Sequence, residues 1–247
     1  MPLTSFKYSL LSISFLLLCW YALAELINNP LLPAPTIVFT TLIDSIKSGE
    51  LPYHLSITFY RLCISFFLAM LIGSSIGIYL GRYSKANAIF DSWLIILLNI
   101  PALVTIVLCY VWFGLIEAAA ILAVVLNKVP NVVVTLREGT RNMDKQLMEM
   151  AQAYQFGRLK TLQHVILPQL YPYFMASART GLALIWKIIL VVELLGCSSG
   201  MGFQIHLFFQ LFDITSILAY TISFIIIIQI IESFILKPLD RHAQRWK

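Results

Sequence analysis

The chain has 247 residues, of which 60% are hydrophobic and 12% are charged. Soluble domains are typically about 45–50% apolar and about 25% charged. A soluble fold of this length could not bury so much apolar surface, so the composition excludes an ordinary soluble domain and indicates a membrane protein. The net charge is +5. The basic residues lie in short segments between apolar runs, which is the membrane pattern and argues against nucleic-acid binding.

Chemistry-bearing residues are scattered rather than grouped. The four cysteines form no C-x-x-C pair, so neither a disulfide framework nor a zinc site is indicated. The four histidines have no metal-ligand partner at useful spacing. The sequence contains no G-x-x-x-x-G-K-[ST] phosphate loop. We therefore expect no cofactor on this chain and no catalysis by it.

Six apolar runs are long enough to cross a bilayer, which takes about 20 residues of helix. Backbone polar groups in lipid must be satisfied internally, so each run is predicted to be a helix. The predicted spans are residues 9–27, 56–81, 89–112, 116–136, 170–196 and 214–236. So few residues separate the third and fourth spans that we expect a tight hairpin between them. The chain is thus predicted to be an all-α membrane protein with six transmembrane helices.

The first span has a second interpretation. Lys7 precedes the apolar run and Ala22-Leu23-Ala24 closes it, which mimics a cleavable signal peptide. A retained helix is favoured, because the run is long for a signal and five further spans follow. Residues 28–55 then form a connector whose first part is interrupted by prolines. After Pro35 apolar residues recur at helical spacing, which predicts a short amphipathic helix on the outer surface.

The distribution of Lys and Arg predicts the orientation of the chain. With the N-terminus inside, the outer segments carry only Lys47, and four basic residues lie within spans. Cytoplasmic loops are enriched in Lys and Arg, so both termini are predicted to be cytoplasmic. Within the spans, Arg61 and Lys128 are interpreted as residues that snorkel toward a membrane surface. The twelve basic residues of the inner segments are Lys7, Arg82, Lys85, Arg137, Arg141, Lys145, Arg158, Lys160, Lys237, Arg241, Arg245 and Lys247.

The inner segment at 137–169 is too long and too patterned for a plain connector. Asp144 or Asn142 can cap a helix there. An apolar stripe at helical spacing follows, made of Met143, Leu147, Met150, Ala151 and Tyr154. Gly157 can end that helix or reverse the chain, and a second short helix at about 158–166 is expected to stop at Leu167-Pro168. The pattern leaves docking on a partner and packing on the chain itself equally open.

Three charged residues lie along the fifth span: Arg179, Lys187 and Glu193. Intramembrane charges are costly and usually face a protein interior or water. Lys187, beside Trp186, is a candidate contact for an anionic substrate or a partner across a dimer. Gly181 predicts close helix packing in the same region.

Several motifs occur in a fixed order along the chain. They are Leu32-Pro33-Ala34-Pro35, Ile100-Pro101, Trp112-Phe113-Gly114, Glu149-Met150-Ala151, Leu167-Pro168, Ala178-Arg179-Thr180-Gly181-Leu182, Trp186-Lys187, Glu193-Leu194-Leu195-Gly196 and Gly200-Met201-Gly202. In this set the chain resembles the inner-membrane permeases of binding-protein-dependent ABC importers, in the nitrate, sulfonate and taurine branch. The hallmark glycine of that family is replaced here by Gln155. Either Gln155 tolerates the turn or the preceding helix runs longer.

The resemblance implies a type I ABC importer permease fold with a cytoplasmic helix-turn-helix that couples to a separate ATPase. It divides the chain into residues 1–52, a transmembrane helix and periplasmic connector, residues 53–238, the permease domain, and residues 239–247, a cytoplasmic tail. ATP and Mg²⁺ would bind the ATPase partner. A second permease chain, in a homodimer, and a periplasmic substrate-binding protein would complete the importer in a bacterial inner membrane. The cargo would be a small solute, anionic and sulfonate- or nitrate-like, or a vitamin precursor.

Two sets of site residues follow from the resemblance. Glu149 would pair with a basic residue of the ATPase or cap the inner helix bundle, although it is also readable as a solvated charge. An ion-coupled secondary transporter and a membrane scaffold or enzyme subunit are the competing readings. The coupling set is Asp144, Leu147, Glu149, Met150, Ala151, Tyr154, Gly157, Leu167 and Pro168. The set for the translocation pathway or dimer interface is Arg179, Gly181, Trp186, Lys187 and Glu193.

Overall fold

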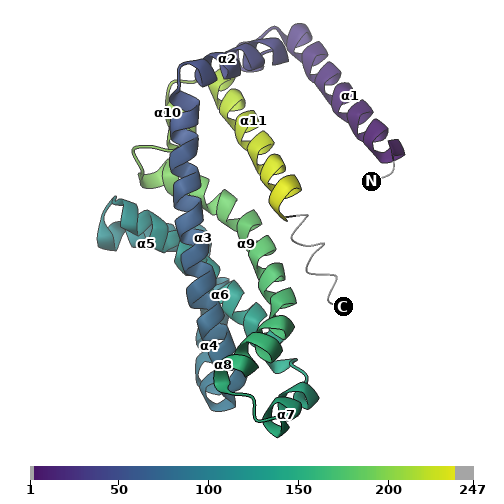
Figure 1. The fold of residues 1–247 in the computed structure, drawn as a ribbon. Coiled ribbons are helices and arrows are strands. Elements are labelled where there is room, and N and C mark those ends of the chain that lie inside the picture. Colours follow the sequence, from purple (N-terminus) through teal and green to yellow (C-terminus); the bar gives the residue numbers. More distant parts are fainter. Residues whose placement is uncertain (1–2, 237–247) are drawn as a thin grey trace.

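The computed structural model describes residues 3–236, and within that range every regular element is a helix (Figure 1). The predicted tail at 239–247 lies outside the described residues. The α-helices are α1 (Leu3–Ile27), α2 (Pro35–Lys47), α3 (Glu50–Arg82), α4 (Ser84–Asn99), α5 (Ala102–Phe113), α6 (Glu117–Arg141), α7 (Lys145–Ala153), α8 (Arg158–Thr161), α9 (Leu167–Gly196), α10 (Met201–Gln210) and α11 (Ile214–Ile231). Two π-helical turns, η1 (Leu162–Ile166) and η2 (Glu232–Leu236), complete the set.

Three helices of the described chain are long and apolar enough to span a membrane on their own: Glu50–Arg82, Glu117–Arg141 and Ile214–Phe234. Two bent pairs, α4 with α5 and Arg158–Gly196 with α10, raise that number to five if each pair is one span. The apolar part of α1, Leu11–Ile27, is shorter. The all-α membrane architecture is therefore confirmed, while the count of six spans stays a prediction.

The third predicted span, 89–112, is not one straight helix. It is divided into α4 and α5, whose axes differ by 96°. Pro101 has no N–H to donate and disfavours helical backbone at the residue before it. Ile100 accordingly has φ −69° and ψ 124°, which is extended backbone. The tight hairpin predicted next is confirmed, because α5 ends at Phe113 and α6 begins at Glu117.

Helices α3 and α6 form the central packing of the fold. Gly73, Gly77 and Gly81 stand four residues apart on α3, and a Cβ on any of them would clash with α6. At Gly73 the clash is with Val132, whose Cβ would lie 2.5 Å away. Small residues at this spacing let two membrane helices approach closely. The contacting positions advance in the same direction along both helices, so α3 and α6 run parallel.

The predicted amphipathic helix after Pro35 is confirmed as α2, but it is part of the core rather than a loose surface element. Val38 and Leu42 of α2 are buried in the main hydrophobic cluster, and α2 packs on α11. The indole N–H of Trp20 donates to the carbonyl of Pro33 and so joins α1 to the connector. The predicted domain boundary at residue 52 falls inside α3, which begins at Glu50.

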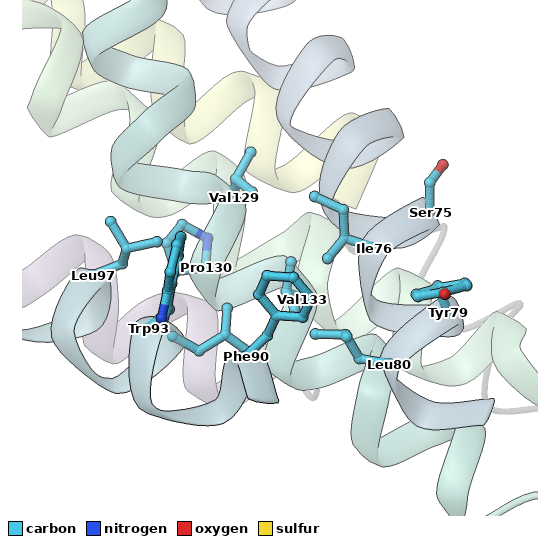
Figure 2. Close-up of a pocket in the computed structure, with 11 residues that line it drawn as sticks. Ser75, Ile76, Tyr79, Leu80, Phe90, Trp93, Leu97, Val129, Pro130 and Val133 are labelled. Carbon is cyan, nitrogen blue, oxygen red and sulfur yellow. The ribbon is translucent and has the colours of Figure 1, made fainter. Parts of the chain in front are cut away.

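An apolar groove of about 530 Å³ lies among α3, α4 and α6 (Figure 2). Its wall includes the rings of Tyr79, Phe90 and Trp93, and both Tyr79 and Trp93 are exposed. Toward the end of these helices that is predicted to be cytoplasmic, the guanidinium of Arg137 pairs with Asp91 and holds α4 against α6. Most of the side chains that line the groove are apolar.

Candidate functional site

The predicted helix-turn-helix is present as α7, α8 and η1. Asp144 is the N-cap of α7, and its side-chain oxygen accepts a hydrogen bond from the N–H of Gln146 at 2.8 Å. The alternative cap, Asn142, instead follows the end of α6. The backbone N–H of Asp144 donates to Oε1 of Gln169, which anchors the start of α7 to α9.

The turn after α7 is made by Gln155 rather than by Gly157. Gln155 has φ +54°, in the left-handed region, whereas Gly157 has φ −62° and is the N-cap of α8. The N–H of Phe156 donates to the carbonyl of Ala151, and that of Gln155 to Gln152, both at 2.9 Å. These two bonds are the Schellman closure of a helix. Gln155 therefore tolerates the turn, and the helix before it does not run longer. The expectation that Gly157 ends the helix or reverses the chain is wrong.

The apolar stripe of α7 is divided between two environments. Ala151 is 1% exposed, and α7 packs on η1, where Val165 is also buried. Leu147 and Met150 are each 40% exposed and Tyr154 is 73% exposed. Packing on the chain itself thus occupies Ala151, while three larger apolar side chains remain uncovered at the end of the molecule opposite α2 (Figure 1).

Glu149 lies beside a basic pocket of about 540 Å³ between α7 and the ends of α3 and α6. Arg82, Arg141 and Lys145 line the same pocket. Glu149 itself is exposed, so its carboxylate is available to a partner as well as to water.

The expectation that Leu167-Pro168 stops the second short helix is wrong. The chain passes from α8 through η1 into α9, and the N–H of Leu167 donates to the carbonyl of Leu162, five residues back. This π-helical step comes directly before Pro168, which lies in the first turn of α9. Both Leu167 and Pro168 are exposed.

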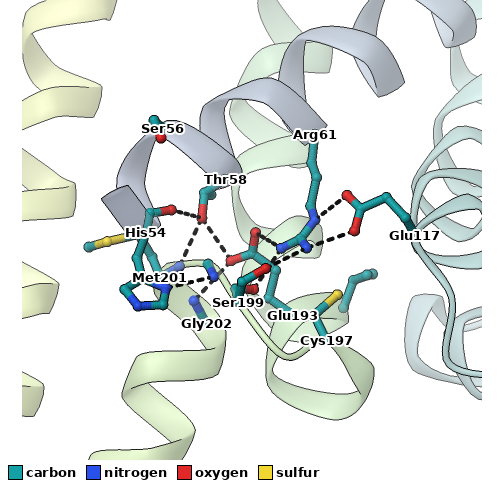
Figure 3. A network of polar contacts seen from close by, with 12 residues as sticks. His54, Ser56, Thr58, Arg61, Glu117, Glu193, Cys197, Ser199, Met201 and Gly202 are labelled. Atoms are coloured by element: carbon teal, nitrogen blue, oxygen red, sulfur yellow. Dashed lines mark hydrogen bonds and ion pairs between the residues drawn. The ribbon is translucent and has the colours of Figure 1, made fainter. Parts of the chain in front are cut away.

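A second polar site lies inside the bundle, where α9 turns into α10 (Figure 3). The guanidinium of Arg61 on α3 binds both carboxylate oxygens of Glu117 on α6, at 2.6 and 2.8 Å. It also donates to Oε1 of Glu193 on α9 at 2.8 Å and to the carbonyl of Ser199 at 2.7 Å. Because Arg61 is 3% exposed, the prediction that it snorkels to the surface is wrong.

The other oxygen of Glu193 is held just as closely. It accepts from the N–H of Gly202 and from the hydroxyl of Thr58, both at 2.9 Å. A Cβ on Gly200, whose φ is +106°, would lie 2.4 Å from the Glu193 carboxyl group. On Gly202 it would lie 2.2 Å from the carbonyl of Leu190. Glycine is thus required at both positions, because only a bare backbone fits around the buried carboxylate.

Residues 69–241 match the sequence family described as binding-protein-dependent transport system inner membrane component. This chain belongs to that family. The permease is therefore the membrane subunit of an ABC importer, a non-catalytic component whose ATP is hydrolysed by a separate ATPase. It is a multi-pass protein of the bacterial inner membrane.

Relatives of the permease cover most of its length. SsuC of Bacillus subtilis (strain 168), named as an aliphatic sulfonates transport permease protein, is 31% identical over 221 residues, 90% of this chain and 80% of SsuC. SsuC of Escherichia coli (strain K12) is 31% identical over 177 residues, 72% of this chain and 67% of that protein. The taurine transport system permease protein TauC of the same strain is 26% identical over 242 residues, 95% of this chain and 88% of TauC.

The five residues predicted for the permease pathway or dimer interface lie in two environments. Gly181, Trp186 and Glu193 are buried within the chain, and Trp186 packs edge-on against another core ring with centroids 5.4 Å apart. Arg179 and Lys187 lie two turns apart on the exposed side of α9. Charged side chains in a span avoid lipid, so this exposed side is the part of α9 suited to a second chain or to water.

The permease also has a polar stripe that sequence reasoning missed. Asn127, Asn131 and Thr135 recur every four residues on α6, so they share one helix face. The amide of Asn127 donates to the carbonyl of Ala123 at 2.8 Å, and the hydroxyl of Thr135 to that of Asn131 at 3.0 Å. Asn131 is exposed. The period of four within an otherwise Val- and Leu-rich run was the signal available in the sequence.

Lys128 lies on the same stretch of the permease and contradicts a second prediction. It is 1% exposed, 11 residues after Glu117 and 13 before Arg141. At 1.5 Å of rise per residue, it is about 17 and about 20 Å from the two ends of α6. A snorkelling side chain would expose its ammonium group, whereas Lys128 is enclosed within the chain, so the prediction that it snorkels is wrong.

Proposed function

We propose that this permease, as a homodimer, forms the membrane pathway for a small anionic solute and receives the force of ATP hydrolysis through α7. The observation that carries the coupling role is the exposure of Leu147, Met150 and Tyr154 on a short capped helix. An amphipathic helix that presents apolar anchors at helical spacing is suited to a groove in a partner protein. In this proposal the partner that binds α7 is the ATPase subunit of the importer.

The anionic class of the solute is supported by the relatives. Their names refer to aliphatic sulfonates, taurine and bicarbonate, which share an anionic group. The charge bias of the sequence supports an orientation with both termini and α7 in the cytoplasm. In that orientation a periplasmic binding protein delivers the solute to the end of the bundle that carries α2.

The coupling follows from two-state mechanics. When two ATPase subunits close around ATP, each carries the α7 docked on it. This movement reaches α9 through the hydrogen bond between Asp144, at the start of α7, and Gln169 on α9. Each state is stabilised by a different ligand, so ATP and the loaded binding protein shift the population between inward and outward openings. Glu149 and its basic neighbours provide the polar rim of the proposed contact.

Co-purification and uptake test the proposal together. The tagged permease is expressed with its ATPase and binding protein, and the complex is reconstituted in liposomes. We expect ATP-dependent accumulation of a sulfonate and its loss when Leu147 and Tyr154 are both replaced by serine. A double variant that inserts, binds the ATPase and transports as the wild type does would rule out α7 as the coupling element.

A further inference from the structure

Lys128 carries a buried ammonium group without a hydrogen-bond partner among residues 3–236. Its side chain is 1% exposed and lies near the middle of α6, a membrane-spanning helix. An isolated charge in an apolar interior is costly, and ionisable groups at this depth generally serve a transported ion or solute. Arg61, by contrast, is bound by two carboxylates in the same bundle.

The carboxylates of α6 and α9 are already engaged elsewhere. Glu117 and Glu193 bind Arg61, and Glu138 lies within ion-pair distance of Arg137 and Arg141. Lys128 therefore has no acidic partner on the two helices that enclose it. The group that would complement its charge is an anion from outside the chain.

The structure leaves space for this side chain at the contact between α6 and α9. Gly181 of α9 lies directly against it, since a Cβ there would be 2.7 Å from Cε and 3.3 Å from Nζ of Lys128. The ring of Phe66 from α3 lies nearby, 3.7 Å from the same Cβ position. The ammonium group is thus enclosed at the contact between α6 and α9, and a ligand reaches it only when these helices separate near Gly181.

Polar groups continue from Lys128 to the exposed face of α6. Asn127 precedes it and Asn131 lies one turn further, which places both on adjoining parts of the helix surface. Pro130 has no N–H, so the carbonyl of Leu126 loses its helical partner at the same depth.

We propose that Lys128 is the anion-binding residue of the permease pathway and that the amides of Asn127 and Asn131 lead a small oxyanion to it. The proposal rests on the proposed import of an anionic solute and assigns that function to a site. Ammonium and amide N–H groups donate to the oxygens of a sulfonate, carboxylate or bicarbonate, and charge-assisted bonds of this kind are strong. Binding takes place in the state in which α6 and α9 have separated.

Uptake by the reconstituted complex with its ATPase and binding protein provides the test, with radiolabelled ethanesulfonate, taurine and bicarbonate as probes. We expect Lys128→Met to lower anion uptake at least tenfold and Lys128→Arg to retain part of it. Lys85→Met removes an exposed charge at the start of α4, outside the predicted spans, and is expected to transport normally. The melting temperature of Lys128→Met should equal or exceed that of the wild type, because a buried unpaired charge is removed.

Each result bears on the proposal. Wild-type uptake by Lys128→Met would overturn the Lys128 site and leave the importer assignment intact. A wild-type complex that carries only neutral or cationic solutes would overturn the anionic substrate and the site together. If Lys128→Met does not insert into the membrane, Asn131→Leu tests the site instead. Asn131 is exposed, so the Asn131→Leu protein should fold normally. Reduced uptake with unchanged ATPase activity then supports the site, and unchanged uptake overturns it.

Discussion

Arg61 on α3 and Glu193 on α9 form an ion pair of 2.8 Å inside the bundle, 132 positions apart in the sequence. The pair joins the first long span to the bend between α9 and α10. Glu117 completes the cluster from α6, so one guanidinium connects three helices (Figure 3). A buried ion pair of this kind is stable only because each of its carboxylate oxygens and guanidinium N–H groups is hydrogen-bonded.

Removal of Arg61 should be among the most damaging single changes in the chain. Arg61→Met leaves Glu193 without its cation in an apolar interior, and breaking a buried pair in this way costs about 3–5 kcal/mol. We expect a large fall in melting temperature of the detergent-solubilised protein. The double variant Arg61→Met with Glu193→Gln should lose less than the sum of the two single variants. Additive losses would show that the two side chains are not coupled.

Gly202 should tolerate no side chain. Gly202→Ala places a Cβ 2.2 Å from the carbonyl of Leu190 and 2.8 Å from Cβ of Glu193. Overpacking of this kind typically costs about 1–3 kcal/mol. Gly157→Ala is the matched control, since nothing lies within 4 Å of its Cβ position and its φ is −62°. Equal melting temperatures for the two variants would contradict the close packing described around the Glu193 carboxylate.

Gln155→Gly should stabilise the turn between α7 and α8. A residue with a Cβ pays about 1 kcal/mol for the left-handed backbone that glycine adopts freely, and Gln155 has φ +54°. We expect slower hydrogen exchange over residues 145–161 and preserved ATPase binding. Gln155→Val should show the opposite, faster exchange. Identical exchange in both variants would mean that the turn does not limit the stability of the hairpin.

Changes on α7 should separate folding from docking. Tyr154→Ser alters a side chain that is 73% exposed, so we expect normal insertion and melting but weaker co-purification of the ATPase. Ala151→Leu alters a position that is 1% exposed and should disturb the packing of α7 on η1 before any partner binds. Pull-down and hydrogen exchange, measured on both variants, distinguish these effects. A Tyr154→Ser protein that retains the ATPase fully would argue against the docking face.

The sequence predicted elements well wherever one local rule dominated. The cap at Asp144, one of two candidates, the helix after Pro35 and the hairpin before Glu117 each follow from short-range chemistry, and each is present. Predictions failed where two local rules competed. Pro168 was expected to stop a helix, but a π-helical turn absorbs it. The glycine at position 157 was expected to reverse the chain, but Gln155 does so.

Composition and hydropathy by themselves determined that this is a helical membrane protein, because long apolar runs favour lipid and their backbone groups must then be hydrogen-bonded within the segment. The ordered motifs added the resemblance to importer permeases. Only the tertiary structure decided the fate of the charges within the spans. Arg61 finds two carboxylates from distant helices, whereas Lys128 finds none among the described residues. Such outcomes depend on which helices meet and in what register, and side-chain pairing between distant segments is invisible until the chain is folded.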